Sequence, residues 1–356
     1  MLSGSGVGRV RLAAARAPAP LPRLAIEDAA FVSDHWRRYH AEAPSRPPFD
    51  LAALGPLPVR LNGPGLIWSA GRLLDDNAIM PVYVRPEIDR PGSTLLSAAT
   101  ALPVRRERRP GLVFHGWGVR VYGHFLIEML PKLLLARRFP ALFATTAPVL
   151  DRQMANWMID MLHRYCGIDP ARAIWFDSAT EQLDLDQAIV LPLLTRVGGY
   201  HPLVAELIDD FVATTALPPD APRPRLFVAR GDFTNPAAPW RRLANEPDLA
   251  AIAAERFGFT VIQPETLDFA AQIGLFAQAN IILGQAGSGM HNALFAPPGA
   301  ITGMLRFPAP DQSAIAALRG QGIAYLTEGI SEIQPHVFHA DPALFTGFVE
   351  RLLAGP

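Results

Sequence analysis

The spacing of apolar residues predicts helices and strands that alternate through most of the chain. Apolar positions recur at intervals of three and four over residues 122–139, 151–165 and 203–215, which is typical of amphipathic helices. Pro131 predicts a kink or a late start in the first of these helices. A further short helix is expected near Asp34–His40. Short β-like runs predict strands at LIWSAG (66–71), PVYVRP (81–86), IWF (174–176) and AIVLP (188–192).

The second half of the chain shows a regular alternation of strands and helices. Its predicted strands are RLFVAR (225–230), FTVIQP (259–264), NIILG (280–284) and AITGML (300–305). Its predicted helices are 246–257, 268–279 with Asp268 as N-cap, and 290–295. This alternation indicates an α/β fold with a parallel sheet that helices cover on both faces, which is the architecture of nucleotide-binding domains.

The length of 356 residues predicts two domains, or one large one. The segment LPPDAPRPR, residues 217–225, holds four prolines where helix and strand both fail, and we interpret it as an interdomain linker. An N-terminal α/β domain then covers residues 1–216, and a C-terminal domain covers residues 226–356. Residues 1–50 are rich in Pro, Ala and Arg and are expected to form an irregular segment along the edge of the first domain.

Charge and composition exclude several classes of protein. The net charge is −1, so no overall field attracts nucleic acid, and no nucleic-acid partner is expected. A single cysteine, Cys166, excludes an internal disulfide and suits a reducing compartment, hence the prediction of a cytoplasmic protein. Residues 269–305 carry no charge, but frequent polar residues and prolines argue for a buried core and against a transmembrane segment. A peripheral contact with the inner membrane stays open.

A glycine loop follows the predicted strand NIILG. Gly284, Gly287 and Gly289 stand between a strand and a helix, where missing side chains let backbone N–H groups approach a phosphate. Ser288, His291 and Asn292 add side-chain donors for the same anion or a sugar. The spacing is not the G-x-G-x-x-G of dinucleotide-binding proteins, and the alternative is a set of glycines that only pack helix against strand.

A second cluster is basic. Arg230 ends its predicted strand, and Arg241 and Arg242 precede Asn245 and Glu246 at a helix start. Ligands of parallel sheets bind at the carboxyl ends of strands, so these arginines are candidates to grip a diphosphate. Solvated surface arginines are the alternative.

A third cluster lies on the helix predicted for residues 122–139. His124, Glu128 and Lys132 are spaced four apart and form one polar stripe on an apolar helix. A histidine oriented by a carboxylate is a candidate general base, although such a pair can also be structural. Asp184 and Asp186 have the D-x-D spacing of some metal sites, but they alternate with leucines as on the wet face of a strand, and no metal is expected. The chain contains neither a nucleophile elbow nor a Walker loop.

With these residues in view, the chain resembles glycosyltransferase family 61. The blocks that carry the resemblance are GHFLIEMLP near residue 124, LFVAR with Gly231-Asp232, RRLANE, GFTVIQPETLDFAAQIGLFAQANIILG and GSGMHNALFAPPG, in that order. They cover about half of the chain.

The resemblance implies two Rossmann-like domains of the GT-B type with a nucleotide sugar in the cleft between them, no metal, and sugar transfer with inversion. On this basis the C-terminal domain binds the donor and the N-terminal domain the acceptor. The residues implied to bind the donor are Arg230, Asp232, Arg242, Asn245, Glu246, Glu265, Gln272, Gly287, Gly289 and Asn292. Two positions depart from the family pattern: Ala286 stands where many members have histidine, and the acidic residue of the next strand is absent around Gly303.

The sequence therefore predicts an inverting glycosyltransferase of bacterial surface-polysaccharide synthesis. It would use a nucleotide sugar as donor, a glycan or lipid-linked acceptor, no cofactor, and His124 with Glu128 as the catalytic pair. The alternatives are a non-catalytic protein that binds a nucleotide sugar or a glycan, and a subunit of a polysaccharide assembly complex.

Overall fold

The computed structural model describes residues 8–63, 65–74, 89–93, 97–98, 100–114, 116, 121–196, 199–214, 223–231, 242–306 and 308–355. Contacts within the chain define two compact units. The first comprises Met1–Ala17 and Pro47–Val197, and the second comprises Pro18–Arg46 and Gly198–Pro356. Residues 217–222 of the expected linker fall outside the described residues, so the linker stays a prediction.

The first unit is built on a mixed sheet whose strands run in the order β4-β3-β2-β9-β6-β7-β8, with β1 paired to β2 and β5 paired to β9. Strands β9, β6, β7 and β8 are mutually parallel, whereas β1, β2, β3 and β4 form antiparallel pairs, and β2 pairs antiparallel with β9. The strands are β1 (Arg9–Arg16), β2 (Phe49–Asn62), β3 (Leu66–Ser69), β4 (Arg72–Leu73), β5 (Val104–Glu107), β6 (Gly111–Val113), β7 (Ala147–Asp151), β8 (Ile174–Phe176), β9 (Gln182–Val190) and the short β10 (Thr195–Arg196).

Helices connect the parallel strands of this first unit. They are α5 (Tyr122–His124), the π-helical segment η1 (Phe125–Met129), α6 (Leu130–Arg137), α7 (Pro140–Thr145), α8 (Asn156–Cys166) and the 3₁₀ turn η2 (Pro170–Arg172). One hydrophobic core gathers inward-facing residues of β2 and β9, such as Val59, Leu61, Leu183 and Leu185, against Phe176.

The second unit contains a five-stranded parallel sheet of order β14-β12-β15-β16-β17. The strands of this unit are β11 (Gly199–Tyr200), β12 (Arg225–Val228), β13 (Arg242–Leu243), β14 (Thr260–Ile262), β15 (Ile281–Gln285), β16 (Ile301–Leu305), β17 (Gly322–Leu326), β18 (Ile330–Gln334) and β19 (Val337–Ala340). Its helices are α1 (Asp34–Ala41), α9 (Leu203–Ala213), α10 (Glu246–Phe257), η3 (Pro264–Thr266), α11 (Phe269–Gln278), η4 (Ser288–Phe295), α12 (Pro310–Arg319) and α13 (Pro342–Ala354).

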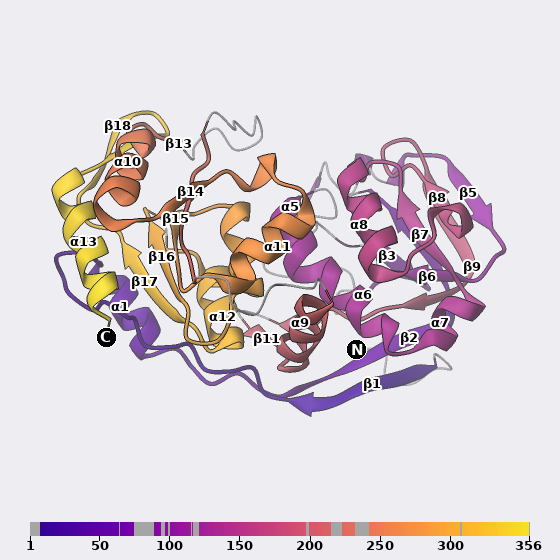
Figure 1. The fold of residues 1–356 in the computed structure, drawn as a ribbon. Coiled ribbons are helices and arrows are strands. Elements are labelled where there is room, and N and C mark those ends of the chain that lie inside the picture. The colour runs from indigo at the N-terminus through magenta and orange to yellow at the C-terminus, as the bar shows by residue number, and fades with distance from the viewer. Residues whose placement is uncertain are drawn as a thin grey trace. The chain divides into compact units, whose positions relative to one another are not determined.

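Helices cover both faces of this parallel sheet, as Figure 1 shows. Helices α10 and α13 pack on one face, and their residues Leu249, Phe345 and Phe348 join Phe227 and Leu283 of the strands in one core. Helices α9, α11 and α12 lie on the other face. The α/β class with a parallel sheet is therefore confirmed. The expectation of two Rossmann-like domains stays a prediction, because the sheet of the first unit is mixed.

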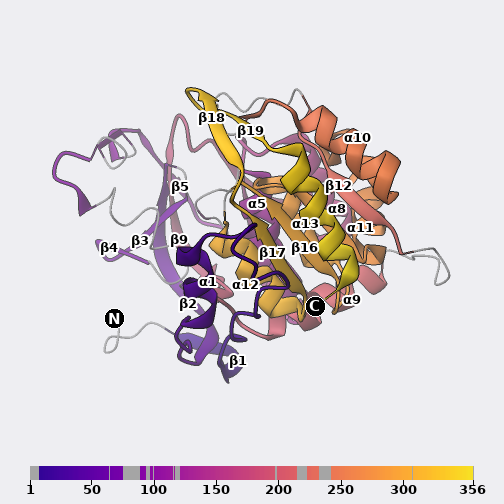
Figure 2. The ribbon, with the colours of Figure 1, turned by 90° about the vertical axis from the view of Figure 1, so that its left-hand side faces the viewer.

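The segment of residues 18–46 belongs to the second unit although it comes early in the chain. Leu24 forms a parallel bridge with Ile323 at the outer strand β17, and Figure 2 shows α1 close to β17 and α12. Phe31 packs its ring 5.9 Å from that of Phe348 in α13. The sequence instead predicts these residues along the edge of the first domain, so their place in the second unit differs from that expectation.

Local sequence explains where several elements begin and end. Asp268 accepts a hydrogen bond from the N–H of Ala271, which confirms it as the N-cap of α11. Gly258 ends α10 with the positive φ of 69° that a left-handed C-cap needs. The helix predicted over 151–165 is wrong at its start, since α8 begins only at Asn156. Asp151 instead ends β7 and is buried, where its carboxylate accepts hydrogen bonds from Gln153 N and Ser178.

Candidate functional site

The strand order of the second unit creates a switch point between β12 and β15. These strands are neighbours, but the chain leaves β12 toward β14 on one side and leaves β15 toward β16 on the other. Their connections therefore diverge at the carboxyl ends, and in parallel α/β sheets this is where ligands bind. Arg230 follows β12, and the glycine loop with Gly287 follows β15. The structure thus brings Arg230 of the basic cluster and the glycine loop to one edge.

Glu246 holds the two loops at this edge together. Its Oε2 atom accepts hydrogen bonds from the backbone N–H groups of Arg230 (2.9 Å) and Gly231 (3.0 Å). Its Oε1 atom accepts one from the Nε2 atom of Gln285 at the end of β15 (2.7 Å). Burial raises the pKa of the Glu246 carboxyl, and these three hydrogen bonds oppose the rise by favouring the ionised form. Glu246 therefore positions Arg230.

The guanidinium of Arg230 lies against the backbone of the glycine loop. Its Nη1 atom donates to the carbonyl oxygen of Ala286 at 3.4 Å. A Cβ atom added at Gly287 would lie 3.0 Å from the same Nη1 atom, so a side chain at this position would force the guanidinium to shift. Gly287 has an extended backbone, and the 3₁₀ helix η4 starts at Ser288. A guanidinium next to glycine backbone, at the start of a helix, forms a suitable environment for a phosphate.

The glycine loop is anchored from behind by amide side chains. Asn292 is fully buried, and its Nδ2 atom donates to Gln272 Oε1 (3.3 Å) and to the carbonyl oxygen of Gly289 (3.1 Å). Gln272 donates in turn to the carbonyl oxygen of Leu267 (3.1 Å). These contacts tie the loop to α11. They make Asn292 and Gln272 positioning residues for Gly287 and Gly289.

The other residues predicted for donor binding are spread around this edge. Asn245 pairs with the backbone of Ala340 through Nδ2 (2.8 Å) and Oδ1 (3.1 Å), which fixes β19. Glu265 is exposed in η3, and His291 is partly buried in η4. Asp232 and the side chain of Arg242 lie outside what the structure describes. Their assignment stays a prediction. The helix expected over 290–295 is a 3₁₀ helix that already starts at Ser288.

One basic residue at the same edge is not among the predicted site residues. Arg306 follows β16, is 7% exposed and has a positive φ of 79°. Its Cζ atom lies 3.3 Å from the ring centroid of Phe338. A non-glycine residue with positive φ at the carboxyl end of a strand is an unusual conformation that often marks functional sites. A basic residue directly after the strand AITGML is visible in the sequence, but the sequence pattern does not reveal the positive φ of Arg306.

The His124–Glu128 pair lies in the first unit, on the helix that contains the π-helical segment. His124 Nδ1 is 2.7 Å from Glu128 Oε1, and the Glu128 side chain is buried while that of His124 is 25% exposed. An ionised carboxylate can only accept, so Nδ1 carries the proton and Nε2 is left as the basic atom. The contact predicted from the spacing is present. Its catalytic role stays a prediction.

Lys132 continues this polar stripe into the core. It is the only lysine of the chain and is fully buried, with Nζ 3.5 Å from the carbonyl oxygen of Phe114. Burial lowers the pKa of Lys132 to about 8, while the charge of Glu128 acts in the opposite direction. A cation and a carboxylate therefore lie close together in a poorly solvated environment.

The two aspartates of the D-x-D pattern lie on the solvent-facing side of β9, as predicted. Asp184 forms a two-pronged ion pair with Arg60 at 2.6 and 2.8 Å, and Leu183 and Leu185 point into the core. In the parts of the chain that the structure describes, no three His, Cys, Asp or Glu side chains gather in a way that could hold a metal ion. Within the same parts, no helix has the length and apolar character needed to cross a membrane.

The switch-point arginine and the glycine loop lie together at the carboxyl edge of a doubly covered parallel sheet, and the fold is that of an α/β protein. The comparison with protein families is more specific. The model of the family described as Glycosyltransferase 61 matches residues 122–305, just over half of the chain, and the chain belongs to that family. The matched region runs from the helix of His124 to the end of β16. No curated protein matches the chain.

Proposed function

We propose that the protein is an inverting, metal-independent glycosyltransferase that moves a sugar from a nucleoside-diphosphate sugar to a glycan or lipid-linked acceptor. The observation that carries the proposal is the placement of the Arg230 guanidinium against Gly287 at the switch point. The family membership supports the general activity. The departure of a nucleoside diphosphate needs positive charge and aligned N–H donors, and this edge of the sheet supplies both.

In the proposed reaction the leaving group is stabilised by the second unit. As the bond between the anomeric carbon and the phosphate oxygen breaks, its electron pair goes to the departing diphosphate. Arg230 and the backbone N–H groups of Ser288 and Gly289 would bind the growing negative charge. Arg306 adds a further cation at the same edge. Because Glu246 and Asn292 fix these groups in advance, little reorganisation is needed in the transition state.

The acceptor is activated in the proposal by His124. The acceptor hydroxyl attacks the anomeric carbon from the side opposite the diphosphate and passes its proton to His124 Nε2, so the configuration inverts. Glu128 keeps Nδ1 protonated and stabilises the imidazolium that forms. Lys132 acts as a positioning residue, because its ammonium group attracts the Glu128 carboxylate in the buried environment.

The biological setting is part of the same proposal. The resemblance to bacterial members of the family supports a role in capsular or exopolysaccharide synthesis. A chain with one cysteine, whose thiol is buried with its pKa raised to about 12 by burial, suits a reducing cytoplasm. We therefore propose action in the cytoplasm, with acceptors that are free glycans or lipid-linked at the inner membrane.

A non-catalytic nucleotide-sugar-binding protein or assembly subunit is the second candidate. The specific observation in its favour is Ala286, which stands in the glycine loop where many family members have histidine. On this alternative the phosphate-type edge would bind a donor and leave it intact.

The experiment is calorimetric titration of the full chain with UDP, GDP, CMP and dTDP sugars, with and without EDTA, followed by a turnover assay. We expect one donor class to bind in EDTA. Arg230→Ala should weaken transition-state stabilisation by about 2–4 kcal/mol, as expected for loss of one preorganised donor. Arg242→Ala tests the second predicted arginine. Arg256→Ala is the matched control, since Arg256 lies exposed on α10 over Phe257.

The outcomes separate the candidates. Binding that survives EDTA and turnover that falls in Arg230→Ala, but not in Arg256→Ala, would support the transferase. Donor binding without turnover would favour the binding protein. Absence of binding by every donor would overturn the proposal and favour the assembly subunit.

A further inference from the structure

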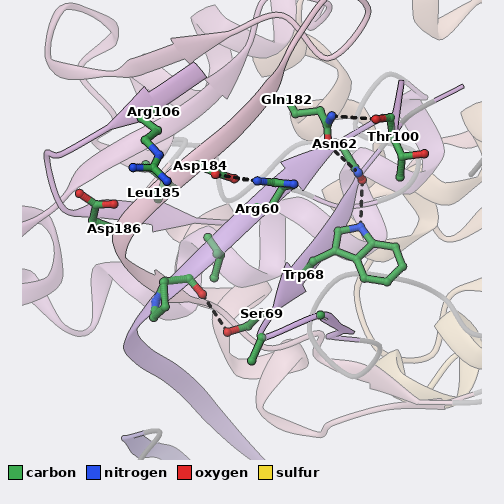
Figure 3. A pocket seen from close by; sticks show the side chains of 14 residues that line it. Arg60, Asn62, Trp68, Ser69, Thr100, Arg106, Gln182, Asp184, Leu185 and Asp186 are labelled. Atoms are coloured by element: carbon green, nitrogen blue, oxygen red, sulfur yellow. Dashed lines mark hydrogen bonds and ion pairs between the residues drawn. The ribbon is translucent and has the colours of Figure 1, made fainter. Parts of the chain in front are cut away.

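A groove on the first unit is lined by residues that belong neither to the proposed donor site nor to the His124–Glu128 pair. It has a volume of about 700 Å³, which is in the range of ligand-binding pockets, of about 300–1,000 Å³. Strands β2, β3, β5 and β9 line it, so it lies on the wide mixed sheet (Figure 3). All of its lining residues belong to the first unit.

The groove is built around one row of side chains that crosses four strands. In the sheet register Arg106 of β5 pairs with Asp184 of β9, Asp184 pairs with Arg60 of β2, and Arg60 pairs with Trp68 of β3. Residues directly opposite one another on paired strands share a face. Strands lie about 4.8 Å apart, so this row spans about 14 Å, which suits an elongated ligand.

A second row beside it is locked by hydrogen bonds. Trp68 Nε1 donates to Asn62 Oδ1 (3.0 Å), and Asn62 Nδ2 donates to Gln182 Oε1 (3.2 Å). Gln182 Nε2 donates to the carbonyl oxygens of Leu102 (2.6 Å) and Thr100 (3.1 Å). Asn62 and Gln182 are 1% and 3% exposed, so these amides and the indole are fixed before any ligand arrives. A preorganised surface costs less entropy on binding.

The charges of the groove favour an uncharged ligand. Two arginines, Arg60 and Arg106, face two aspartates, Asp184 and Asp186, so their formal charges cancel. The guanidinium of Arg60 is already held by both carboxylate oxygens of Asp184, and this hydrogen bond raises the pKa of Arg60. A phosphate would have to break that pair and approach two carboxylates. A neutral polar molecule meets no such penalty.

The same groups match the chemistry of a carbohydrate. Adjacent sugar hydroxyls donate and accept hydrogen bonds side by side, and the planar carboxylates, guanidinium groups and amides of the groove offer paired donors and acceptors. The C–H face of a sugar ring is apolar, and the indole ring of Trp68 offers it an apolar surface. The indole also has a polar N–H edge, as suits an amphipathic ligand. The groove is therefore suited to a chain of sugars.

We propose that this groove is a second carbohydrate site, which holds an uncharged oligosaccharide segment of the acceptor away from the sugar that receives the transfer. The link to the acceptor rests on the proposed function, whereas the binding of a neutral glycan rests on the groove alone. The site belongs to strands β2, β3, β5 and β9, and not to the helix of His124 or to the switch point of the second unit.

The test is binding of the full chain to an array of neutral, sulfated and phosphorylated oligosaccharides, followed by calorimetry with the best neutral member and no donor present. Trp68→Ala should weaken binding at least tenfold, and Trp68→Phe should retain part of it. The double variant Arg106→Ala with Asp186→Ala should also weaken binding and leave the core intact, since both side chains are exposed. The matched control is Trp175→Ala, because Trp175 is partly buried on β8 of the same sheet and its Nε1 likewise donates one hydrogen bond, in this case to the carbonyl oxygen of Pro170.

Each result decides something. Neutral glycan binding that falls in the groove variants and persists in Trp175→Ala supports the site. Absence of neutral glycan binding, binding only to sulfated or phosphorylated members, or equal binding by the groove variants overturns it. Donor titration of the wild-type chain and of Arg230→Ala in parallel keeps the two proposals apart. Glycan binding that depends on Trp68, without donor binding, retains the groove and rejects the transferase. Donor binding that depends on Arg230, without glycan binding, rejects only the groove.

Discussion

A single lysine in the core of the first unit links local electrostatics to the proposed chemistry. Lys132 is fully buried, and the buried carboxylate of Glu128 on the same helix compensates its charge only in part. Taking a charge out of water is costly unless a partner of opposite charge is near. The pKa of Lys132 therefore falls to about 8.

We expect this shift to be measurable directly, because a chain with one lysine gives one side-chain resonance after isotope labelling of lysine. NMR titration of the folded protein should give a midpoint near pH 8. The same resonance in concentrated urea should titrate at about 10.4, as in unfolded peptides. A folded midpoint above 10 would contradict the placement of Lys132.

The same shift predicts a pH dependence of stability. Between pH 8 and the unfolded pKa, the unfolded state keeps a proton on Lys132 that the folded state has released, so the free energy of unfolding rises with pH. The gain relative to Lys132→Met should be on the order of 3 kcal/mol over this window. Denaturant unfolding of both proteins at pH 7, 8, 9 and 10 tests it. A constant difference between them would show that Lys132 does not titrate in this range.

Side-chain contacts on one helix were predictable from the sequence, whereas contacts between segments were not. The spacing of four residues was enough to predict that His124 meets Glu128. The role of Glu246 needs three separate segments, since it binds the backbone of residues 230–231 and the side chain of Gln285. No local pattern in the sequence carries that information.

At the scale of elements, the helix of His124 is shaped by one proline. Pro131 has no N–H and cannot bond to the carbonyl of Ile127, four residues earlier, and its ring would crowd that carbonyl in a regular α-helix. The preceding segment Phe125–Met129 is π-helical, and the N–H of Leu130 bonds to the carbonyl of Phe125, five residues earlier. π-helical turns of this kind are frequent at functional sites.

Pro131→Ala should therefore reduce catalysis without unfolding the protein. The restored N–H favours a regular α-helix, which would rotate His124 relative to the rest of the helix and lengthen its contact with Glu128. We expect lower kcat with little change in donor Kd and no loss of thermal stability. Pro140→Ala is the control, because Pro140 stands in the first turn of α7, where no N–H is needed. Equal effects of the two substitutions on kcat would reject this role of Pro131.

The strands of the parallel sheet in the second unit could be predicted from the sequence, but their order in the sheet could not. The predicted strands at 225–230, 280–284 and 300–305 correspond to β12, β15 and β16, and the helix over 246–257 matches α10. The order β14-β12-β15-β16-β17 depends on contacts between distant segments. In the first unit the run AIVLP is the end of a longer strand, β9, whose first half alternates polar and apolar residues. The predicted strand PVYVRP lies outside the described residues.

At the scale of the whole molecule, each unit has its own hydrophobic core, and the second core depends on a distant segment of the chain. Residues 18–46 pack on the edge strand β17, where the N–H of Ala25 donates to Ile323 O (2.8 Å) and the N–H of Thr327 donates to Phe31 O (2.8 Å). An uncovered edge strand is prone to pairing with other chains. This segment covers the β17 edge of the parallel sheet, whereas β14 is the strand at the opposite edge.

Trp36 is the side chain that tests this dependence. It is buried on α1, with its ring 4.5 Å from that of Tyr39 and 5.7 Å from that of Tyr325 on β17. Trp36→Ala in the full chain should lower the free energy of unfolding of the second unit by about 3–5 kcal/mol, the usual cost of removing a large buried aromatic side chain. Hydrogen exchange should then accelerate at β16 and β17 and stay unchanged at β6 and β7.

Trp175→Ala is the reciprocal variant, since Trp175 lies on β8 in the first unit. It should accelerate exchange at β7 and leave β17 protected. If Trp36→Ala instead accelerated exchange in both units equally, the chain would unfold as one cooperative body, and residues 18–46 could not be assigned to the second core alone. A selective effect would show that residues 18–46 are part of the folding unit that carries the glycine loop, although about 150 residues of the first unit separate them from it in sequence.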